Sequence, residues 1–401
     1  MGSSLLTTLL LLLLGALLAR LTATRLERWA IPAIVLELLV GFVLGNTVLP
    51  FAAIKPLSGL TELGVLTLFF QVGLEVQGGL LGARPWAVVR TVALSALTPL
   101  LAWWPLQQGL GLPTATTLLF LAVLSATGTG VALRVLSQRG AVATPSGRLL
   151  VGVSVLDDLP AIALLSLALA LGGRSGQPLV GPAGSAAGLV VGVLLAAASF
   201  PLAGWWVRRH GALEPGRLEV MLLLIGCSWL GEFFGLTSLL GALWGGALFT
   251  RLAPMEEGSP KGLELRGVLG LLSEVFLPLY FLSVGMRIDG GSLMQPSAWG
   301  TAALLIALGI ACKLICALGI DRADRAAGVD RWVVVFGLIP RGLPGLVFAS
   351  TALGAGVISA VQFSSLVLMV AVTTVLGLLL LGWRLQGLDT RPRGLTGGPH
   401  G

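Results

Sequence analysis

The chain of 401 residues is 56% hydrophobic and only 11% charged, with a formal net charge of +7. Soluble globular domains carry about 25% charged residues, so this composition excludes a cytosolic enzyme and a disordered chain. The basic residues are scattered between apolar runs rather than clustered, which excludes a nucleic-acid-binding surface and is typical of a membrane protein.

Long apolar runs follow one another along the whole chain. A bilayer-spanning helix needs about 20 mostly apolar residues, and thirteen runs come close to that length. They cover approximately residues 4–19, 31–50, 59–78, 86–107, 114–136, 148–171, 182–207, 219–235, 236–250, 268–286, 298–320, 332–350 and 359–383. We therefore predict an all-α polytopic membrane protein with about 13 transmembrane helices.

The first run could be mistaken for a signal peptide. It has no basic residue before its apolar stretch, and Arg20, Arg25 and Arg28 follow it, so we predict a retained helix. The longest loop, about 251–267, has fewer than 20 residues, so no large soluble domain is expected. The segment 384–401 is short and rich in Gly and Pro, and we predict a short cytoplasmic tail there.

The distribution of basic residues predicts the orientation. With the N-terminus outside, 20 of the 25 Lys and Arg residues fall in or beside cytoplasmic segments and three, Lys55, Arg174 and Arg287, on the opposite side. Only Lys313 and Arg341 remain at membrane depth. This asymmetry is a strong positive-inside signal, and it predicts an external N-terminus and a cytoplasmic C-terminus.

Cysteine and histidine give no sign of a cofactor. Cys227, Cys312 and Cys316 lie in apolar runs, and we interpret them as packing residues. Cys312 and Cys316 share a helix face, but a metal site there lacks a third ligand. His210 and His400 lie in a loop and in the tail, so we expect no histidine proton relay and no cofactor.

Two apolar runs contain residues that interrupt helices. Residues 125–136 read SATGTGVALRVL and include Gly128 and Gly130, and residues 338–350 read LIPRGLPGLVFAS and include Pro340, Arg341 and Gly342. Each is the fourth helix of a five-helix set, segments 2–6 and 9–13. Five is odd, so the second set would be inverted, and paired broken helices of this kind indicate a transporter site. The alternative is a pair of kinks without function.

Few charges fall inside the apolar runs. Three lie near the middle of a segment: Asp157, Asp158 and Lys313. Adjacent helical residues point about 100° apart, so one Asp can pair with Lys313 while the other faces a water-filled cavity. Two such close carboxylates do not both stay ionised without a nearby cation, so the site can hold a proton or a small cation. Ser154 lies one turn before Asp158 and could add an oxygen ligand for sodium.

The alternative interpretations of these charges are structural. Asp157 and Asp158 could belong to an ion-pair network that transports nothing, and Lys313 could be a plain counter-ion. We expect Arg341 to stabilise its broken helix rather than contact the substrate.

These motifs resemble bacterial sodium/proton antiporters of the monovalent cation:proton antiporter superfamily, in its two-aspartate, electrogenic branch. The similarity rests on SATGTGVALRVLSQRG and VGVSVLDDLPAIALL, with IVLELLVGFVLGN, LTELGVLTLFFQVGLEV, GEFFGLTSLLGALWGGALF, LPLYFLSVGMRID and LIPRGLPGLVFAS, over about residues 31–350. It implies two inverted five-helix repeats with crossing discontinuous helices, the sodium/proton antiporter fold.

The resemblance also implies domains and site residues. Residues 1–78 and 219–287 would form a dimerisation domain, 86–171 and 298–383 a moving transport core, and 182–207 a linker helix. Asp158 would bind the transported Na⁺, Asp157 would pair with Lys313, and Thr127 would lie at the crossing. Two positions depart from the family: Gly128 stands where Ser is frequent, and Leu343 replaces an acidic neighbour of Arg341.

These observations together predict a secondary active transporter rather than an enzyme. It would exchange Na⁺ or Li⁺ for protons by an elevator-like alternating-access mechanism, as a homodimer among membrane lipids, and without a nucleic-acid partner. The expected location is the bacterial inner membrane. The alternatives are K⁺/H⁺ exchange by the same mechanism, a carrier of organic anions or a gated channel on this scaffold, and a non-transporting sensor.

Overall fold

The structure is a computed structural model that describes residues 5–25, 33–76, 84–128, 131–132, 135–136, 139–142, 144–172, 186–213, 216–234, 238–253 and 260–389. All elements within these ranges are helices. Nine helical stretches of the described chain are long and apolar enough to cross a bilayer. The prediction of an all-α polytopic membrane protein is confirmed.

Each of the thirteen apolar runs overlaps at least one helix. Several of these helices are short, however: Ala33–Thr47, Thr114–Ser125, Arg217–Phe233 and Ser238–Leu252 have 15, 12, 17 and 15 residues. The run at 114–136 and the run at 332–350 are each interrupted. The number of complete spans therefore stays a prediction.

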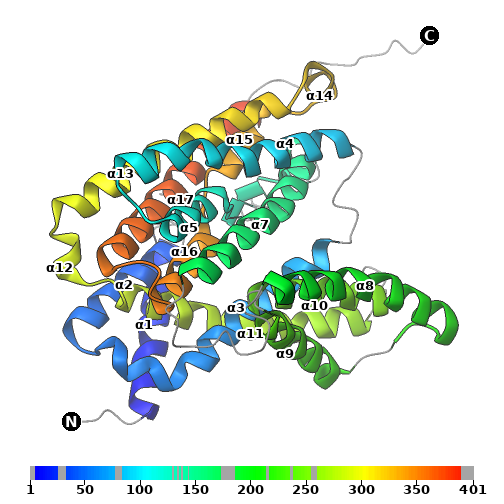
Figure 1. The fold of residues 1–401 in the computed structure, drawn as a ribbon, viewed down its shortest axis with the longest axis horizontal. Helices are drawn as coiled ribbons and strands as arrows, with labels where there is room; N and C mark the ends of the chain where they lie inside the picture. Colours follow the sequence, from blue (N-terminus) through cyan, green and yellow to red (C-terminus); the bar gives the residue numbers. More distant parts are fainter. Residues whose placement is uncertain are drawn as a thin grey trace.

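One set of helices, which we call the scaffold group, lies in the lower part of Figure 1. It comprises α1 (Leu5–Arg25), α2 (Ala33–Thr47), α3 (Ser58–Val76), α9 (Arg217–Phe233), α10 (Ser238–Leu252) and α11 (Pro260–Met286). In this group α11 packs on α2 and α3, and α10 packs on α3 and α9.

Glycines let these helices approach closely. A Cβ added to Gly41 would lie 2.2 Å from the Leu282 carbonyl oxygen, and one added to Gly246 would lie 2.0 Å from the carbonyl of Phe70. No side chain larger than hydrogen fits at either contact. Small residues are the usual means of close helix packing in membranes, where lipid tails compete with apolar side chains.

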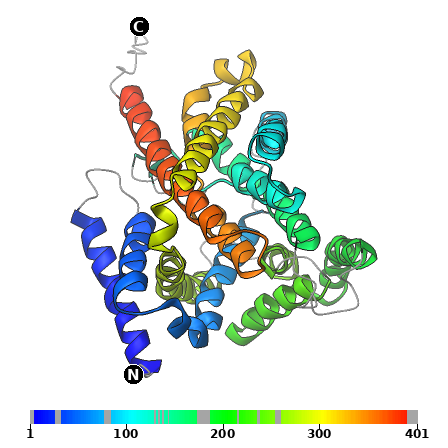
Figure 2. The same ribbon diagram turned by 60° about the vertical axis from the view of Figure 1, so that its left-hand side comes forward.

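The other set, the crossing group, fills the upper part of Figure 1. It comprises α4 (Pro85–Leu97), α5 (Thr114–Ser125), α7 (Pro145–Gly172), α13 (Pro296–Ile315), α15 (Arg331–Leu338), α16 (Gly342–Gly354) and α17 (Ala360–Asp389). Helix α5 packs on α7, and α17 packs on α13, α15 and α16 (Figure 2). Nearly every residue of α5 and α16 is buried, so these two short helices form the centre of the group.

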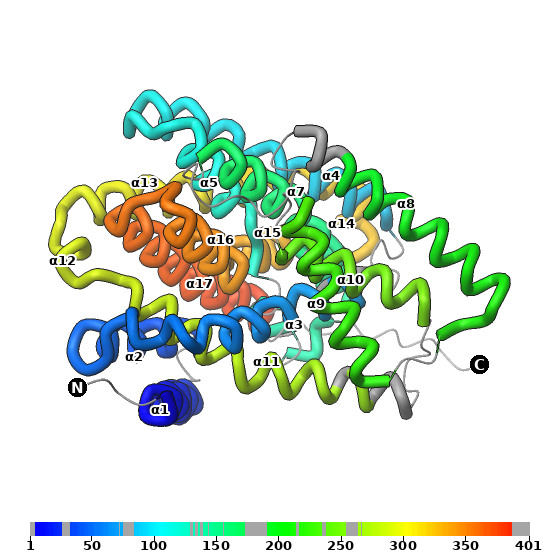
Figure 3. The backbone as a smooth tube through the Cα atoms, turned by 60° about the horizontal axis from the view of Figure 1, so that its bottom comes forward, coloured from blue at the N-terminus to red at the C-terminus, as the bar shows by residue number. Residues whose placement is uncertain are grey.

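Three further helices connect or extend these groups. Helix α8 (Ala186–His210) packs on α10 along the outside of the molecule, as Figure 3 shows. The short α12 (Gly290–Leu293) and α14 (Arg322–Ala326) flank α13. The domain boundaries, and which group dimerises and which one moves, stay predictions.

A carboxylate caps the start of α15 and joins it to α17 at one end of the crossing group. Asp330 precedes α15 and accepts hydrogen bonds from the backbone N–H groups of Trp332 and Val333, and Arg384 of α17 lies 2.5 Å from its Oδ2. Burial raises the pKa of Asp330, but these hydrogen bonds outweigh that effect and hold its pKa below the ordinary value.

We expect Asp330→Ala to lower the free energy of unfolding by about 1–2 kcal/mol, the usual cost of losing a helix cap. Because the folded pKa is lower than the unfolded one, this stabilisation is complete above the unfolded pKa and is lost as the pH falls through the folded pKa. Unfolding of the wild type and the variant, followed in detergent from neutral to acidic pH, should converge at the acid end. An equal difference at every pH would contradict this role.

Candidate functional site

Two interrupted helices cross at the centre of the crossing group. Helix α5 ends at Ser125, and the chain up to Gly128 is not helical, while α15 ends at Leu338 and α16 begins at Gly342. The N–H of Gly128 donates to the carbonyl of Pro340 at 2.6 Å. The two breaks therefore meet directly. Gly130, the other glycine predicted at this crossing, lies outside the described residues.

The contact between the breaks is too close for side chains. A Cβ on Gly128 would lie 3.0 Å from the Gly342 nitrogen, and a Cβ on Gly342 would lie 3.0 Å from the Gly128 Cα. Gly342 also has a φ of +48°, which L-residues rarely adopt. This approach gives a physical reason for glycine at position 128, where the resemblance suggested serine.

We expect Gly128→Ala to lower the free energy of unfolding by about 1–3 kcal/mol, because the segments must separate. Gly342→Ala should cost more, about 2–4 kcal/mol, since strain in the left-handed region adds to the contact. Gly226→Ala on α9 is the matched control, because its Cβ would meet nothing within 4 Å. Thermal unfolding in detergent measures all three. A control as damaging as Gly342→Ala would contradict the close-crossing explanation.

Arg341 holds the broken end of α5. Its guanidinium is fully buried and donates to the carbonyls of Leu124, of Ala126 at 3.0 Å and of Gly309 at 2.8 Å. The last carbonyls of a helix lack partners inside the helix and form the negative end of its dipole. Arg341 therefore serves as a cationic cap for α5, and within the described chain it has no carboxylate partner.

Asp157 is the more heavily bonded of the two adjacent acids. It is fully buried, and its Oδ2 lies 2.6 Å from Lys313 Nζ and accepts hydrogen bonds from Thr127 Oγ1 at 2.6 Å and Ser95 Oγ at 2.7 Å. Its Oδ1 is buried without a partner. Asp157, rather than Asp158, is thus the carboxylate that pairs with Lys313.

Lys313 joins this pair to the broken helix. Its ammonium, also fully buried, donates to the Ser125 carbonyl at 2.8 Å, to Thr127 Oγ1 at 3.1 Å and to the hydroxyl of Ser95. Two buried cations, Lys313 and Arg341, therefore both bind carbonyls at the end of α5. A buried ion pair needs such additional hydrogen bonds to offset its desolvation.

Asp158 has a different environment. It is 2% exposed, and in the described chain it accepts one hydrogen bond, from the Thr127 N–H to Oδ1 at 3.3 Å. Ser154 is buried one turn earlier, but its hydroxyl donates to the Val151 carbonyl at 3.1 Å. Its oxygen keeps lone pairs free for a further ligand. Asp158 is consequently an under-coordinated buried carboxylate beside the crossing.

Ser95 is a residue of this site that the sequence motifs missed. It lies on α4 in the run VALSAL, and one Ser in an apolar helix usually bonds to its own backbone. Here it bonds to Asp157 and Lys313 instead. Only the packing of α4 against α7 and α13 brings the three together.

The cysteines take no part in a metal site of the described chain. Cys312 donates to the carbonyl of Thr98, and Cys316 to that of Cys312, each at 3.4 Å. No cluster of three metal-ligating side chains occurs among the described residues. These contacts are those of buried packing residues.

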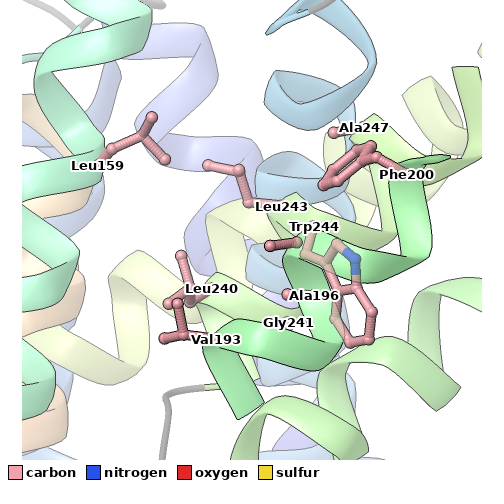
Figure 4. A pocket seen from close by; sticks show the side chains of 10 residues that line it. Leu159, Val193, Ala196, Phe200, Leu240, Gly241, Leu243, Trp244 and Ala247 are labelled. Carbon is pink, nitrogen blue, oxygen red and sulfur yellow. The ribbon is translucent and has the colours of Figure 1, made fainter. Parts of the chain in front are cut away.

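An apolar cavity borders α7, the helix that carries Asp157 and Asp158. It has a volume of about 300 Å³ and is bounded by α7, α8 and α10 (Figure 4). Leu159 borders it on α7, one residue beyond Asp158, and Val193, Phe200, Leu243 and others form its remaining walls. The indole N–H of Trp244 donates to Ser199. With such walls the cavity offers no ligands for an ion.

Comparison with known proteins decides the family. A model of the transmembrane domain of sodium/hydrogen exchangers matches residues 9–386, nearly the whole chain. The chain belongs to the sodium/hydrogen exchanger family. This membership confirms the resemblance to monovalent cation:proton antiporters and the prediction that the chain is not an enzyme.

Relatives and a solved structure agree with this family. A Na⁺/H⁺ antiporter of Enterococcus hirae is 26% identical over 88% of this chain and 92% of its own. The Na⁺/H⁺-K⁺ antiporter GerN of Bacillus cereus is 24% identical over 86% and 88%. The structure of the sodium proton antiporter MjNhaP1 from Methanocaldococcus jannaschii matches with a TM-score of 0.66 at 20% identity, covering 95% of this chain and 97% of its own, which shows a shared exchanger fold.

Some relatives are much longer than this chain. The cation/H⁺ antiporter 18 of Arabidopsis thaliana is 27% identical over 86% of this chain, and the match spans 44% of the plant protein. This exchanger chain thus spans less than half of the plant relative and about nine-tenths of the two bacterial ones.

Proposed function

We propose that the protein is a secondary active antiporter that exchanges a monovalent cation for protons across a membrane. The observation that carries this proposal is the unequal bonding of two adjacent buried acids. Among the described residues, Asp157 has three side-chain donors on Oδ2, whereas Asp158 accepts one backbone N–H. A buried carboxylate with so few donors is costly unless a cation or a proton neutralises it.

Competition for Asp158 gives the mechanism. Either a cation or a proton neutralises its charge, but both do not bind together, so loading one releases the other. Thr127 links the acids, because its N–H bonds Asp158 and its hydroxyl bonds Asp157. The two interrupted helices supply the irregular backbone that transporters place at such sites.

We propose Na⁺, or Li⁺, as the preferred cation. Carboxylate and hydroxyl oxygens suit a hard ion, and Ser154 lies on the same helix face as Asp158, where it could add an oxygen. K⁺ is the second candidate, because the relatives of this chain include antiporters named for Na⁺ and for K⁺. Proton movement in proteoliposomes driven by Na⁺, Li⁺ or K⁺ gradients tests the choice.

We further propose electrogenic exchange, with more protons than cations moved per cycle. The buried Lys313–Asp157 pair supplies a second group that can release and rebind a proton. The reversal potential in proteoliposomes at set ion gradients gives the proton:cation ratio. A ratio of one would contradict the proposal.

The assembly is part of the same proposal. The protein would act as a homodimer through the scaffold group while the crossing group moves, with α8 as the linker, in a bacterial inner membrane with the N-terminus outside. Within the described chain most helix contacts lie inside one group, and the groups meet where α7 contacts α3 and α10, which supports this division. Cross-linking of cysteines introduced on α1 and α9, followed in membranes, tests the dimer.

Two other transport classes fit the site less well. An organic-anion carrier would have to bind its substrate beside two acids, where repulsion opposes it. A channel needs no proton coupling, so cation flux without proton movement would favour it.

A further inference from the structure

A hydroxyl on α4 also bonds the buried ion pair. Ser95 is fully buried, donates to Asp157 Oδ2 at 2.7 Å and accepts from the Lys313 ammonium. Thr127 contacts the same two groups from the crossing. The pair is therefore bonded by two hydroxyls, one from α4 and one from the non-helical segment after α5.

A hydroxyl is suited to this place because it is both donor and acceptor. It can rotate to donate to whichever neighbour lacks a proton, so it stays satisfied when the pair is charged and when it is neutral. Inside a protein, a hydrogen bond to a charged group is stronger than one between two neutral groups.

We propose that Ser95 is a positioning residue for cation–proton exchange, which holds the Lys313 ammonium on Asp157. The inference rests on the proposed function. Ser95 acts through the pair and does not contact the transported cation.

Other charged and titratable groups also lie near the pair, and they act on it together with Ser95. They are Asp157 and Asp158 of α7, Lys313 and Cys312 of α13, Cys316 directly after α13, and Arg341 beside α16. None of them changes in the variants below unless it is named.

Ser228 provides a matched control. It is also buried, it lies on α9 outside the site, and its hydroxyl donates to the Leu224 carbonyl one turn earlier on the same helix. Removing a hydroxyl that bonds the carbonyl of its own helix is close to neutral, whereas removing one that bonds charged groups is costly. Ser95→Ala and Ser228→Ala therefore delete the same atom from buried positions with opposite expectations.

The experiment measures Na⁺-driven proton movement in proteoliposomes across a range of pH. We expect Ser95→Ala to lower the exchange rate about tenfold at neutral pH and to change the shape of the pH profile, because the hydroxyl's bonds to both charged groups are lost. Ser95→Thr, which keeps the hydroxyl, should restore both rate and profile. Ser228→Ala should match the wild type.

Three outcomes would overturn the inference: an unchanged profile in Ser95→Ala, equal effects of the two alanine variants, or no rescue by threonine in a folded protein. If Asp158→Asn abolishes exchange while Ser95→Ala leaves it unchanged, the proposed function holds and the inference about Ser95 fails.

Measurements of thermal stability test the bonds of Ser95 to the ion pair independently of transport. Ser95→Ala should lower the melting temperature in detergent by a few degrees, and Ser228→Ala should not. The effect should disappear in a Lys313→Met, Asp157→Asn background, where the hydroxyl has no charged partner left to hold. If Ser95→Ala costs the same in both backgrounds, the hydroxyl does not act on the pair.

Discussion

Asp158→Asn is expected to reduce cation-driven proton movement to the level of protein-free vesicles. The amide keeps the shape of the side chain and can still accept from Thr127, but it neither takes up a proton nor offers a charge to a cation. Stability should be unchanged or higher, since a neutral group replaces a buried carboxylate beside Asp157. Proton movement read by a pH-sensitive dye in proteoliposomes, together with melting in detergent, measures both effects.

The matched control is Glu264→Gln, which makes the same chemical change on an exposed carboxylate paired with Arg217. It should exchange at the wild-type rate. Full exchange by Asp158→Asn would contradict the assignment of the cation and the proton to Asp158, whereas loss in both variants would point to a general defect.

Lys313→Met is expected to be among the most destabilising substitutions in the chain. It leaves Asp157 fully buried without its counter-ion, and breaking a buried pair on one side costs about 3–5 kcal/mol. The double variant Lys313→Met, Asp157→Asn should recover most of this loss, because no unpaired charge remains. Thermal unfolding of the two single variants and the double variant gives the coupling between the residues.

The double variant also tests the role of the pair in transport. If Lys313 carries a proton across the membrane, exchange without it should become electroneutral, and the current should vanish while cation–proton exchange continues. A current unchanged in size and pH dependence would show that the pair only stabilises the protein. A double variant as unstable as Lys313→Met would argue against direct pairing.

The sequence was sufficient to find the buried acids and the breaks in the helices. Charges and Gly or Pro clusters inside apolar runs are costly in a membrane, so Asp157, Asp158 and Lys313 stand out without any structure. The breaks at 126–128 and 339–341 lie where those clusters predict them. The lengths of the apolar runs do not decide the number of complete spans, because short helices such as α5 combine with irregular segments.

The bonding partners of the site residues were harder to predict from the sequence than the positions of those residues. Nothing in the sequence connects Arg341 with the carbonyls of Leu124, Ala126 and Gly309, because it lies more than 200 residues along the chain from the end of α5. Ser95 was missed for the same reason. Ser154, predicted from its spacing, is indeed near Asp158 along the helix, yet its hydroxyl proton is used by Val151.

The low charge content determined by itself that the chain lies in a membrane, because there is too little polar surface for water, and the few charges left at depth marked the working residues. Only the tertiary structure decided which acid is paired and which is under-coordinated. Neighbouring aspartates share one local sequence. In the part of the chain that the structure describes, α4, α13 and the crossing bring Ser95, Lys313 and Thr127 onto Asp157, whereas Asp158 accepts from a single backbone donor.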